Sequence, residues 1–222
     1  MKKLSLYVFL VLMFCGNALA ESKNRDIRLN QLFEQLKKSN NASLAFEIEM
    51  KIWNIWSTHP THDSLTQSLA KGSGLISKGE LEAAYKIFST IIESDSDWAE
   101  GWNKRATVLY LMGRYQESLK DIDEVLKLES RHFGALSGQG LVQTELKNYE
   151  KAIKSYQAVQ KIYPSIRAAK VMIPQLRKLI KEGAIWGLVS ICRCCLSRLV
   201  EQAKSANIIG KSTFLMCIVS LI

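Results

Sequence analysis

The chain has 222 residues, of which 47% are hydrophobic and only three are proline, so it is long enough to bury a sizeable core. Its formal net charge is +9, but a net +5 of this lies in the first twenty residues and after Gly183, and the rest is spread over mixed-sign segments. Because there is no block of like charge and no basic stripe with interleaved aromatic residues, the composition does not indicate a nucleic-acid-binding protein.

The chain begins with a segment typical of export. Lys2 and Lys3 precede an apolar run that ends at Phe14, and an Ala-Leu-Ala sequence ends at Ala20. This order predicts a secretory signal peptide over residues 1–20 and an exported, periplasmic protein. The alternative is that the same segment stays uncleaved and anchors the protein to the inner membrane.

Residues 21–64 carry the pattern of two amphipathic helices. Apolar residues recur at helical spacing from Ile27 to Leu36 and again from Ala45 to Trp56. Between these runs, Asn41 is a candidate N-cap, because its side chain can accept hydrogen bonds from the first backbone N–H groups of a helix. We expect a degenerate helical hairpin that packs on the helices directly following it and closes the fold at its N-terminal end.

A repeat of 34 residues fills the middle of the chain in three units, 65–98, 99–132 and 133–166. The eighth position of the units is Gly72, Ala106 and Gly140, and the twentieth is Ala84, Ser118 and Ala152. Small residues there allow two antiparallel helices to approach closely. Larger residues at the twenty-fourth and twenty-seventh positions then fill the space between neighbouring hairpins. Because one unit cannot bury its apolar face alone, the pattern predicts an all-α solenoid of stacked helix-turn-helix units.

Each unit also carries a signal for the turn between its helices. Gly79 and Gly113 can adopt positive φ and end the first helix of their units. In the third unit Lys147 replaces this glycine, and we expect the neighbouring Asn148, which tolerates the left-handed region, to serve there.

This pattern resembles the tetratricopeptide repeat family, whose unit is a helix–turn–helix of the same length. In that family the first helix of each unit lines a concave groove in which peptides bind. The resemblance implies a groove formed here by Ser73, Ser77, Glu100, Asn103, Thr107, Tyr110, Ser137, Leu141, Thr144 and Glu145. Members that bind chaperone tails hold a terminal carboxylate with lysine and asparagine at two groove positions. This chain has Asn103 and Thr107 at these positions, so that carboxylate clamp is absent.

Arg105 occupies a repeat position that is apolar in the family. We expect it to form an ion pair with an acidic residue of a neighbouring helix, and the alternative is a contact with a partner. Trp98 and Trp102 lie one helical turn apart and are expected to pack between repeats instead of forming a ligand site.

Residues 167–182 predict a capping helix, which Pro174 should kink or restart. The tail, residues 183–222, has apolar runs too short to span a membrane. It also contains Cys192, Cys194, Cys195 and Cys217, whose spacing is not a standard zinc pattern and whose disulfide state the sequence leaves open. Two interpretations remain: a membrane-associated tail, or unrelated residues added by a change of reading frame near Glu182.

The sequence shows no catalytic constellation. Gly210-Lys211-Ser212 resembles the end of a phosphate-binding loop, but Ser205 stands where that motif needs a glycine. His59 and His62 lie in a Pro-containing linker, where we expect surface histidines, and His132 has no catalytic partner in the sequence. We therefore expect no enzymatic activity, no cofactor and no metal.

The predicted function is a non-catalytic scaffold that binds a protein or peptide in the concave groove. Two alternatives remain: a self-assembling structural protein, and an accessory subunit of a cell-envelope enzyme complex. We expect no nucleic-acid partner, and we expect membrane association only through the signal segment or the tail. The sequence does not indicate an oligomeric state.

Overall fold

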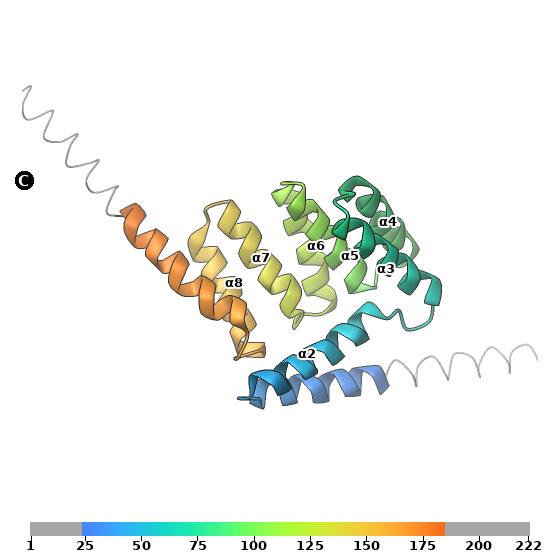
Figure 1. The fold of residues 1–222 in the computed structure, drawn as a ribbon, viewed down its shortest axis with the longest axis horizontal. Helices are drawn as coiled ribbons and strands as arrows, with labels where there is room; N and C mark the ends of the chain where they lie inside the picture. The colour runs from blue at the N-terminus through green and yellow to red at the C-terminus, as the bar shows by residue number, and fades with distance from the viewer. Residues whose placement is uncertain (1–23, 185–222) are drawn as a thin grey trace, which may run out of the picture. The chain divides into compact units, whose positions relative to one another are not determined.

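The computed structural model describes residues 24–184, and every regular element in that range is an α-helix (Figure 1). The chain divides into two compact units, residues 1–176 and 177–222. Of the second unit, residues 177–184 are described, and they are helical. The signal segment and the four tail cysteines lie outside the described residues. Within residues 24–184, no helix combines the length and apolarity needed to cross a bilayer, and no three potential ligand side chains gather as a metal site.

The first unit is a row of helical hairpins. Residues 24–38 form a helix that precedes the labelled helices, and residues 167–176 are helical after them. The labelled helices are α2 (Ala42–Ser57), α3 (Asp63–Ser77), α4 (Leu81–Ser94), α5 (Ala99–Leu111), α6 (Tyr115–Leu128), α7 (Phe133–Glu145) and α8 (Tyr149–Ile162). Figure 1 shows α3 with α4, α5 with α6 and α7 with α8 as antiparallel pairs that stack in chain order. The predicted all-α solenoid of helix-turn-helix units is confirmed.

Close approach inside each pair depends on the small residues of the repeat. An added Cβ at Gly72 would lie 2.6 Å from the ring of Phe88, and one at Gly140 would lie 2.7 Å from the ring of Tyr156. In the middle pair Ala106 takes this place, and the hydroxyl of Ser118 donates to its carbonyl at 2.8 Å. The larger residues expected between the hairpins are all at most 2% exposed: Phe88, Ile91, Ile122, Val125, Tyr156 and Val159.

The turns follow the expected pattern in two units and differ in the third. Gly79 has φ +77° and Gly113 has φ +74°. In the third unit Lys147 itself adopts φ +58°, whereas Asn148 has φ −85°. The expectation that Asn148 replaces the glycine is therefore wrong. The left-handed residue must directly follow the end of the helix, and Lys147 occupies that place. Lys147 therefore adopts the left-handed conformation despite the steric clash of its Cβ atom with the backbone.

Residues 24–57 form the predicted helical hairpin, here called the N-terminal hairpin. The side chain of Asn41 caps α2, accepting from the backbone N–H groups of Ser43 at 2.9 Å and Leu44 at 3.2 Å. The N-cap prediction is confirmed.

The position of the N-terminal hairpin differs from the expectation. Its apolar face forms one core cluster with Phe133, Leu136 and Tyr163, which belong to the third repeat. The phenol of Tyr163 donates to Glu49 at 3.0 Å, and Arg131 donates to Asn30 at 2.6 Å. Instead of packing only on the helices that follow it, the hairpin lies along the ends of α5, α7 and α8 (Figure 1).

Two glycines of α3 give a matched test of the packing rule. We expect Gly72→Ala to lower the free energy of unfolding by about 1–3 kcal/mol, because the new methyl group would collide with Phe88. Gly74 has no heavy atom within 4 Å of an added Cβ, so Gly74→Ala should raise stability by about 0.5–1 kcal/mol through better helix propensity. Urea unfolding followed by circular dichroism measures both, and equal effects of the two changes would contradict the packing argument.

The left-handed Lys147 provides a second test. Lys147→Gly should stabilise the chain by about 0.5–1 kcal/mol, because glycine adopts positive φ without the steric cost that a side chain incurs. The control is Lys151→Gly, an exposed position inside α8, which should lose about 1 kcal/mol. Destabilisation by both changes in thermal unfolding would show that Lys147 is not strained.

Candidate functional site

The N-terminal hairpin covers one end of the face that α3, α5 and α7 were expected to present to a partner. The ring of Trp56 stacks on His132 with 4.0 Å between centroids and 11° between planes. Trp53 meets the ring of Phe133 edge-on at 5.3 Å, and an added Cβ at Gly134 would lie 2.5 Å from Trp53. The start of α7 is therefore occupied by two tryptophans of the chain itself.

A buried polar network lies beneath these tryptophans. The Nδ1 atom of His132 accepts from the backbone N–H of Ala135 at 3.0 Å, so the ring proton is on Nε2, which donates to Glu100 at 3.2 Å. Asn103 donates to the same carboxylate oxygen at 3.1 Å. The other oxygen of Glu100 has the ammonium of Lys104 at 3.3 Å, an ion pair without hydrogen-bond geometry.

The surroundings of Glu100 determine its charge. Burial alone would raise the pKa of this carboxyl, but the hydrogen bond from His132, together with the charge of Lys104, outweighs it. The pKa of Glu100 is therefore below its usual range, and the group is ionised inside the protein. The network joins α5 to the start of α7 directly under the hairpin.

The structure corrects part of the expected groove. Glu100 is 1% exposed, so its side chain does not face a partner as was expected, whereas Asn103 is 7% exposed but lines the hollow between α5 and α7, so its contact with a partner stays a prediction. The burial of Glu100 depends on a segment about fifty residues earlier in the chain, which repeat register cannot indicate. Ser73 and Ser77 remain accessible, but their hydroxyls donate to backbone carbonyls of their own helix at 2.9 and 3.3 Å.

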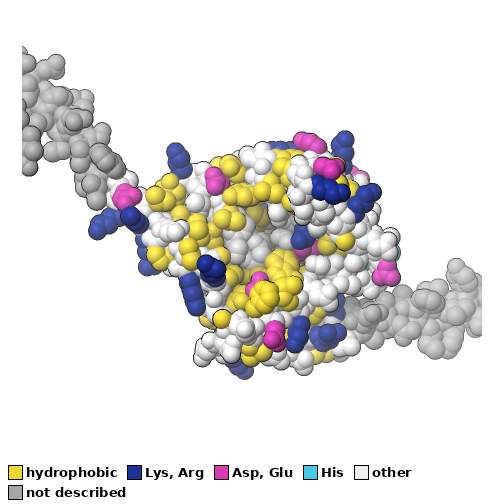
Figure 2. All heavy atoms as spheres, viewed as in Figure 1, with side chains coloured by type: hydrophobic (Ala, Val, Ile, Leu, Met, Phe, Trp, Pro, Cys, Tyr) yellow, Lys and Arg dark blue, Asp and Glu magenta, His cyan; other side chains and the backbone are white. Residues whose placement is uncertain are grey.

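Part of the expected groove lines an open hollow between α5 and α7. The hollow has a volume of about 70 Å³, and the expected residues that line it are Asn103, Thr107, Tyr110 and Leu141. An added Cβ at Gly138 would meet only Ile122, at 3.7 Å, so this part of the face is not filled by the chain. Ser137 is half-buried on the same helix. Figure 2 shows this side of the molecule hollowed at its centre, with most charged side chains around the hollow.

The far end of this face carries a phenol and a carboxylate. Burial and the neighbouring Glu145 raise the pKa of Tyr110, so its hydroxyl stays protonated. Thr144 is half-buried and donates to the carbonyl of Gly140 at 2.7 Å, while Glu145 is exposed. We call Thr107, Tyr110, Leu141 and Glu145 the open groove. It offers apolar surface, hydroxyl groups and one negative charge.

Arg105 has the structural role that was expected. Its guanidinium donates twice to Asp121 on α6, at 2.7 and 2.9 Å, and lies over the ring of Trp102 at 5.0 Å. The hydrogen bond with Asp121 is the main reason why the pKa of Arg105 is raised. Trp98 is buried, and its ring nitrogen donates to the carbonyl of Trp56 at 2.9 Å. The alternative of a partner contact by Arg105 is not needed to explain its position.

Of the two linker histidines, which were both expected at the surface, His59 is not exposed. It is buried, and its Nε2 lies 2.7 Å from Asp95. Its Nδ1 accepts from the backbone N–H groups of Thr61 and His62. His59 therefore fixes the turn between the N-terminal hairpin and the repeats, which explains it without a metal.

Comparisons with known proteins agree with this architecture. The sequence profile described as Tetratricopeptide repeat matches residues 135–166. A TPR repeat-containing protein of Rhizobium etli is 35% identical over 168 residues, covering 72% of this chain and 80% of that protein.

Solved structures show the same fold at low identity. The Sgt2 TPR domain from Aspergillus fumigatus has a TM-score of 0.53 and 14% identity, covering 55% of this chain and 83% of that one. The first TPR of Spaghetti (RPAP3), bound to the HSP90 peptide SRMEEVD, has a TM-score of 0.51 and 17% identity, covering 53% of this chain and 93% of that one.

The buried carboxylate gives a pH-dependent prediction. Glu100→Gln should lower the free energy of unfolding at pH 7 by about 3 kcal/mol, because it removes one member of a buried charge network. A carboxyl with a lowered pKa stabilises the fold above its ordinary value of about 4.5 and loses that contribution as pH falls through the lowered value. The difference between parent and variant should therefore shrink on acidification.

The control for this prediction is Glu124→Gln. Glu124 forms a surface ion pair with Lys127 and should change stability by less than about 1 kcal/mol at any pH. Chemical unfolding at pH values between 3 and 7 measures both variants. A pH-independent difference for Glu100→Gln would contradict the ionised state of Glu100.

Proposed function

The chain belongs to the tetratricopeptide repeat family, and on that premise we propose that it is a non-catalytic scaffold that binds a protein or peptide in the open groove. The observation that supports this best is the hollow lined by Thr107, Tyr110 and Leu141, which the chain's own side chains leave unfilled. An apolar side chain of a ligand would enter the hollow, and the surrounding hydroxyls would bond to its backbone.

The charges of the groove limit the kind of ligand. Lys104, on the same helix as Thr107 and Tyr110, is paired with the buried Glu100, and the exposed charge of the open groove is the carboxylate of Glu145. The RPAP3 domain binds an HSP90 peptide that ends in aspartate. The open groove offers no cation to such a terminus, so we propose a segment with an apolar side chain and no terminal acidic group.

The N-terminal hairpin also limits the length of the ligand. It covers the start of α5 and α7, where a longer bound segment would continue. We propose that the ligand contacts only the later turns of these helices. We also propose export to the periplasm through residues 1–20, an assignment that N-terminal sequencing of the mature protein tests.

The experiment uses two leucines with nearly equal exposure. Leu141 in the open groove is 40% exposed, and Leu128 at the end of α6 is 42% exposed. A photoreactive residue at Thr107 should form covalent adducts with the bound protein in cells that make this chain, and the adduct identifies the partner. Leu141→Lys should then weaken binding of the purified partner about tenfold or more, because burying an ammonium in the hollow is costly.

Leu128→Lys is the control and should leave the affinity unchanged. Isothermal titration calorimetry gives both dissociation constants. If the partner is lost with Leu128→Lys and retained with Leu141→Lys, the binding surface lies on another face and the groove assignment is wrong.

A further inference from the structure

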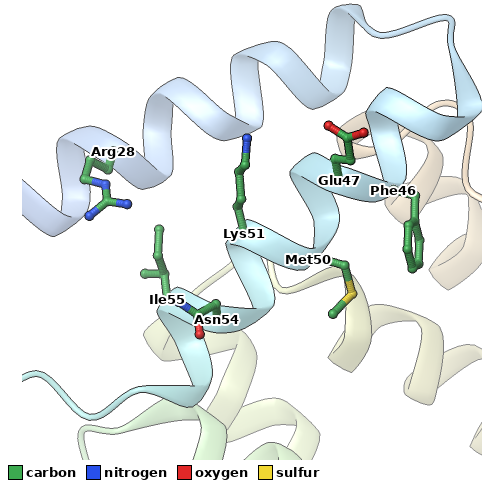
Figure 3. A pocket seen from close by; sticks show the side chains of 7 residues that line it. All are labelled: Arg28, Phe46, Glu47, Met50, Lys51, Asn54 and Ile55. Carbon is green, nitrogen blue, oxygen red and sulfur yellow. The ribbon is translucent and has the colours of Figure 1, made fainter.

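The N-terminal hairpin carries a second cleft, which shares no lining residue with the open groove. Its floor is on α2, where Phe46 is 59% exposed and Met50 is 50% exposed. Arg28, from the preceding helix, lies near Ile55 at one end of the cleft, whereas Phe46 and Met50 lie toward the other end and point away from that helix (Figure 3). The cleft has a volume of about 430 Å³, and we call it the hairpin cleft.

The hairpin cleft uses other residues of α2 than those that pack on the third repeat. Ala45, Ile48 and Ile52 of α2 are buried in the core cluster that includes the third repeat. Phe46 and Met50 lie on other faces of the same helix, and both are more exposed than stability of the fold requires. Their exposure is therefore not explained by packing within the described residues.

One end of the hairpin cleft is basic. A second hollow of about 280 Å³ shares Arg28 and Ile55 with it and adds Arg25. The guanidinium of Arg25 donates to the carbonyl of Ile55 at 2.7 Å, a neutral acceptor. Burial lowers the pKa of Arg25, and the nearby charge of Asp26 opposes this shift without outweighing it. Within residues 24–184, neither Arg28 nor Lys51 forms an ion pair.

We propose that the hairpin cleft binds an acidic segment of a partner protein that carries a large apolar side chain. The apolar side chain would rest on Phe46 and Met50, and the carboxylates would pair with Arg25 and Arg28, whose charges they complement. This ligand chemistry is opposite to that of the open groove, which carries the carboxylate of Glu145. The scaffold would thus hold two chemically different segments at two sites.

A protein segment fits this site better than a membrane surface. Glu47 lines the same cleft and would be repelled by anionic headgroups (Figure 3). A bound protein segment avoids this repulsion, because its apolar side chain can lie next to Glu47 while its acidic groups lie at the Arg25 end of the cleft.

The test uses the full chain and a defined peptide panel. Fluorescein-labelled twelve-residue peptides carry one Phe or Leu and an Asp-Glu pair at varied spacing, and matched peptides carry Asn-Gln in place of the acidic pair. Fluorescence anisotropy should show at least tenfold tighter binding of the best acidic peptide than of its amide match, with affinity falling as salt rises.

Charge reversal distinguishes specific from general attraction. Arg28→Glu should lower the affinity for the acidic peptide at least tenfold and raise the affinity for a peptide with Lys-Arg in place of Asp-Glu. Lys154→Glu, on the exposed surface of α8, should change neither affinity. Phe46→Ser should also weaken binding without unfolding the chain, because the side chain is mostly exposed. Leu141→Lys should have no effect here, so failure of the groove proposal leaves this test intact.

Three outcomes would overturn the proposal. The first is equal binding of acidic and amide peptides, and the second is equal loss with Arg28→Glu and Lys154→Glu. The third is cosedimentation with phosphatidylglycerol vesicles that Arg28→Glu abolishes while no peptide binds, which would assign this face to a membrane surface.

Discussion

The stack of Trp56 on His132 connects three parts of the molecule that would otherwise be independent. His132 caps α7 through its Nδ1 atom, bonds the buried carboxylate of Glu100 on α5 through its Nε2 atom, and presents its ring to the N-terminal hairpin. A buried carboxylate is tolerated only when charge and hydrogen bonds compensate it. The hairpin keeps water from this network, and the network in turn fixes where the hairpin lies. The extent of the open groove follows from this mutual dependence.

The repeat architecture could be predicted from sequence because it depends on local spacing. Small residues such as Gly72 and Gly140 recur at one repeat position, and the structure uses each for the same close approach. The pairing of Arg105 with Asp121 on the next helix was also within reach, because a charge at an apolar repeat position needs a nearby partner. Both inferences require only that one knows which helices are neighbours and how their repeat positions align.

The position of the N-terminal hairpin could not be predicted in this way. Its contacts include Trp56 with His132, 76 positions apart, and Glu49 with Tyr163, 114 positions apart, and the pattern of its apolar residues shows that a face is buried but not against what. Glu100 was therefore assigned to a partner although the chain itself buries its side chain. One signal was present in the sequence: Gly134 provides the space that Trp53 occupies, and a glycine in the first turn of a repeat helix has no propensity reason.

The measurement that tests the account most directly is the effect of Gly134→Ala on stability and on amide hydrogen exchange. If Trp53 packs on Gly134, the new methyl group collides with it, and the account predicts lower stability and faster exchange throughout α2. If the hairpin does not pack there, alanine improves the helix propensity of α7 and should raise stability by about 0.5–1 kcal/mol, with exchange in α2 unchanged. The two results have opposite signs, and the second would contradict the arrangement on which the proposed groove depends.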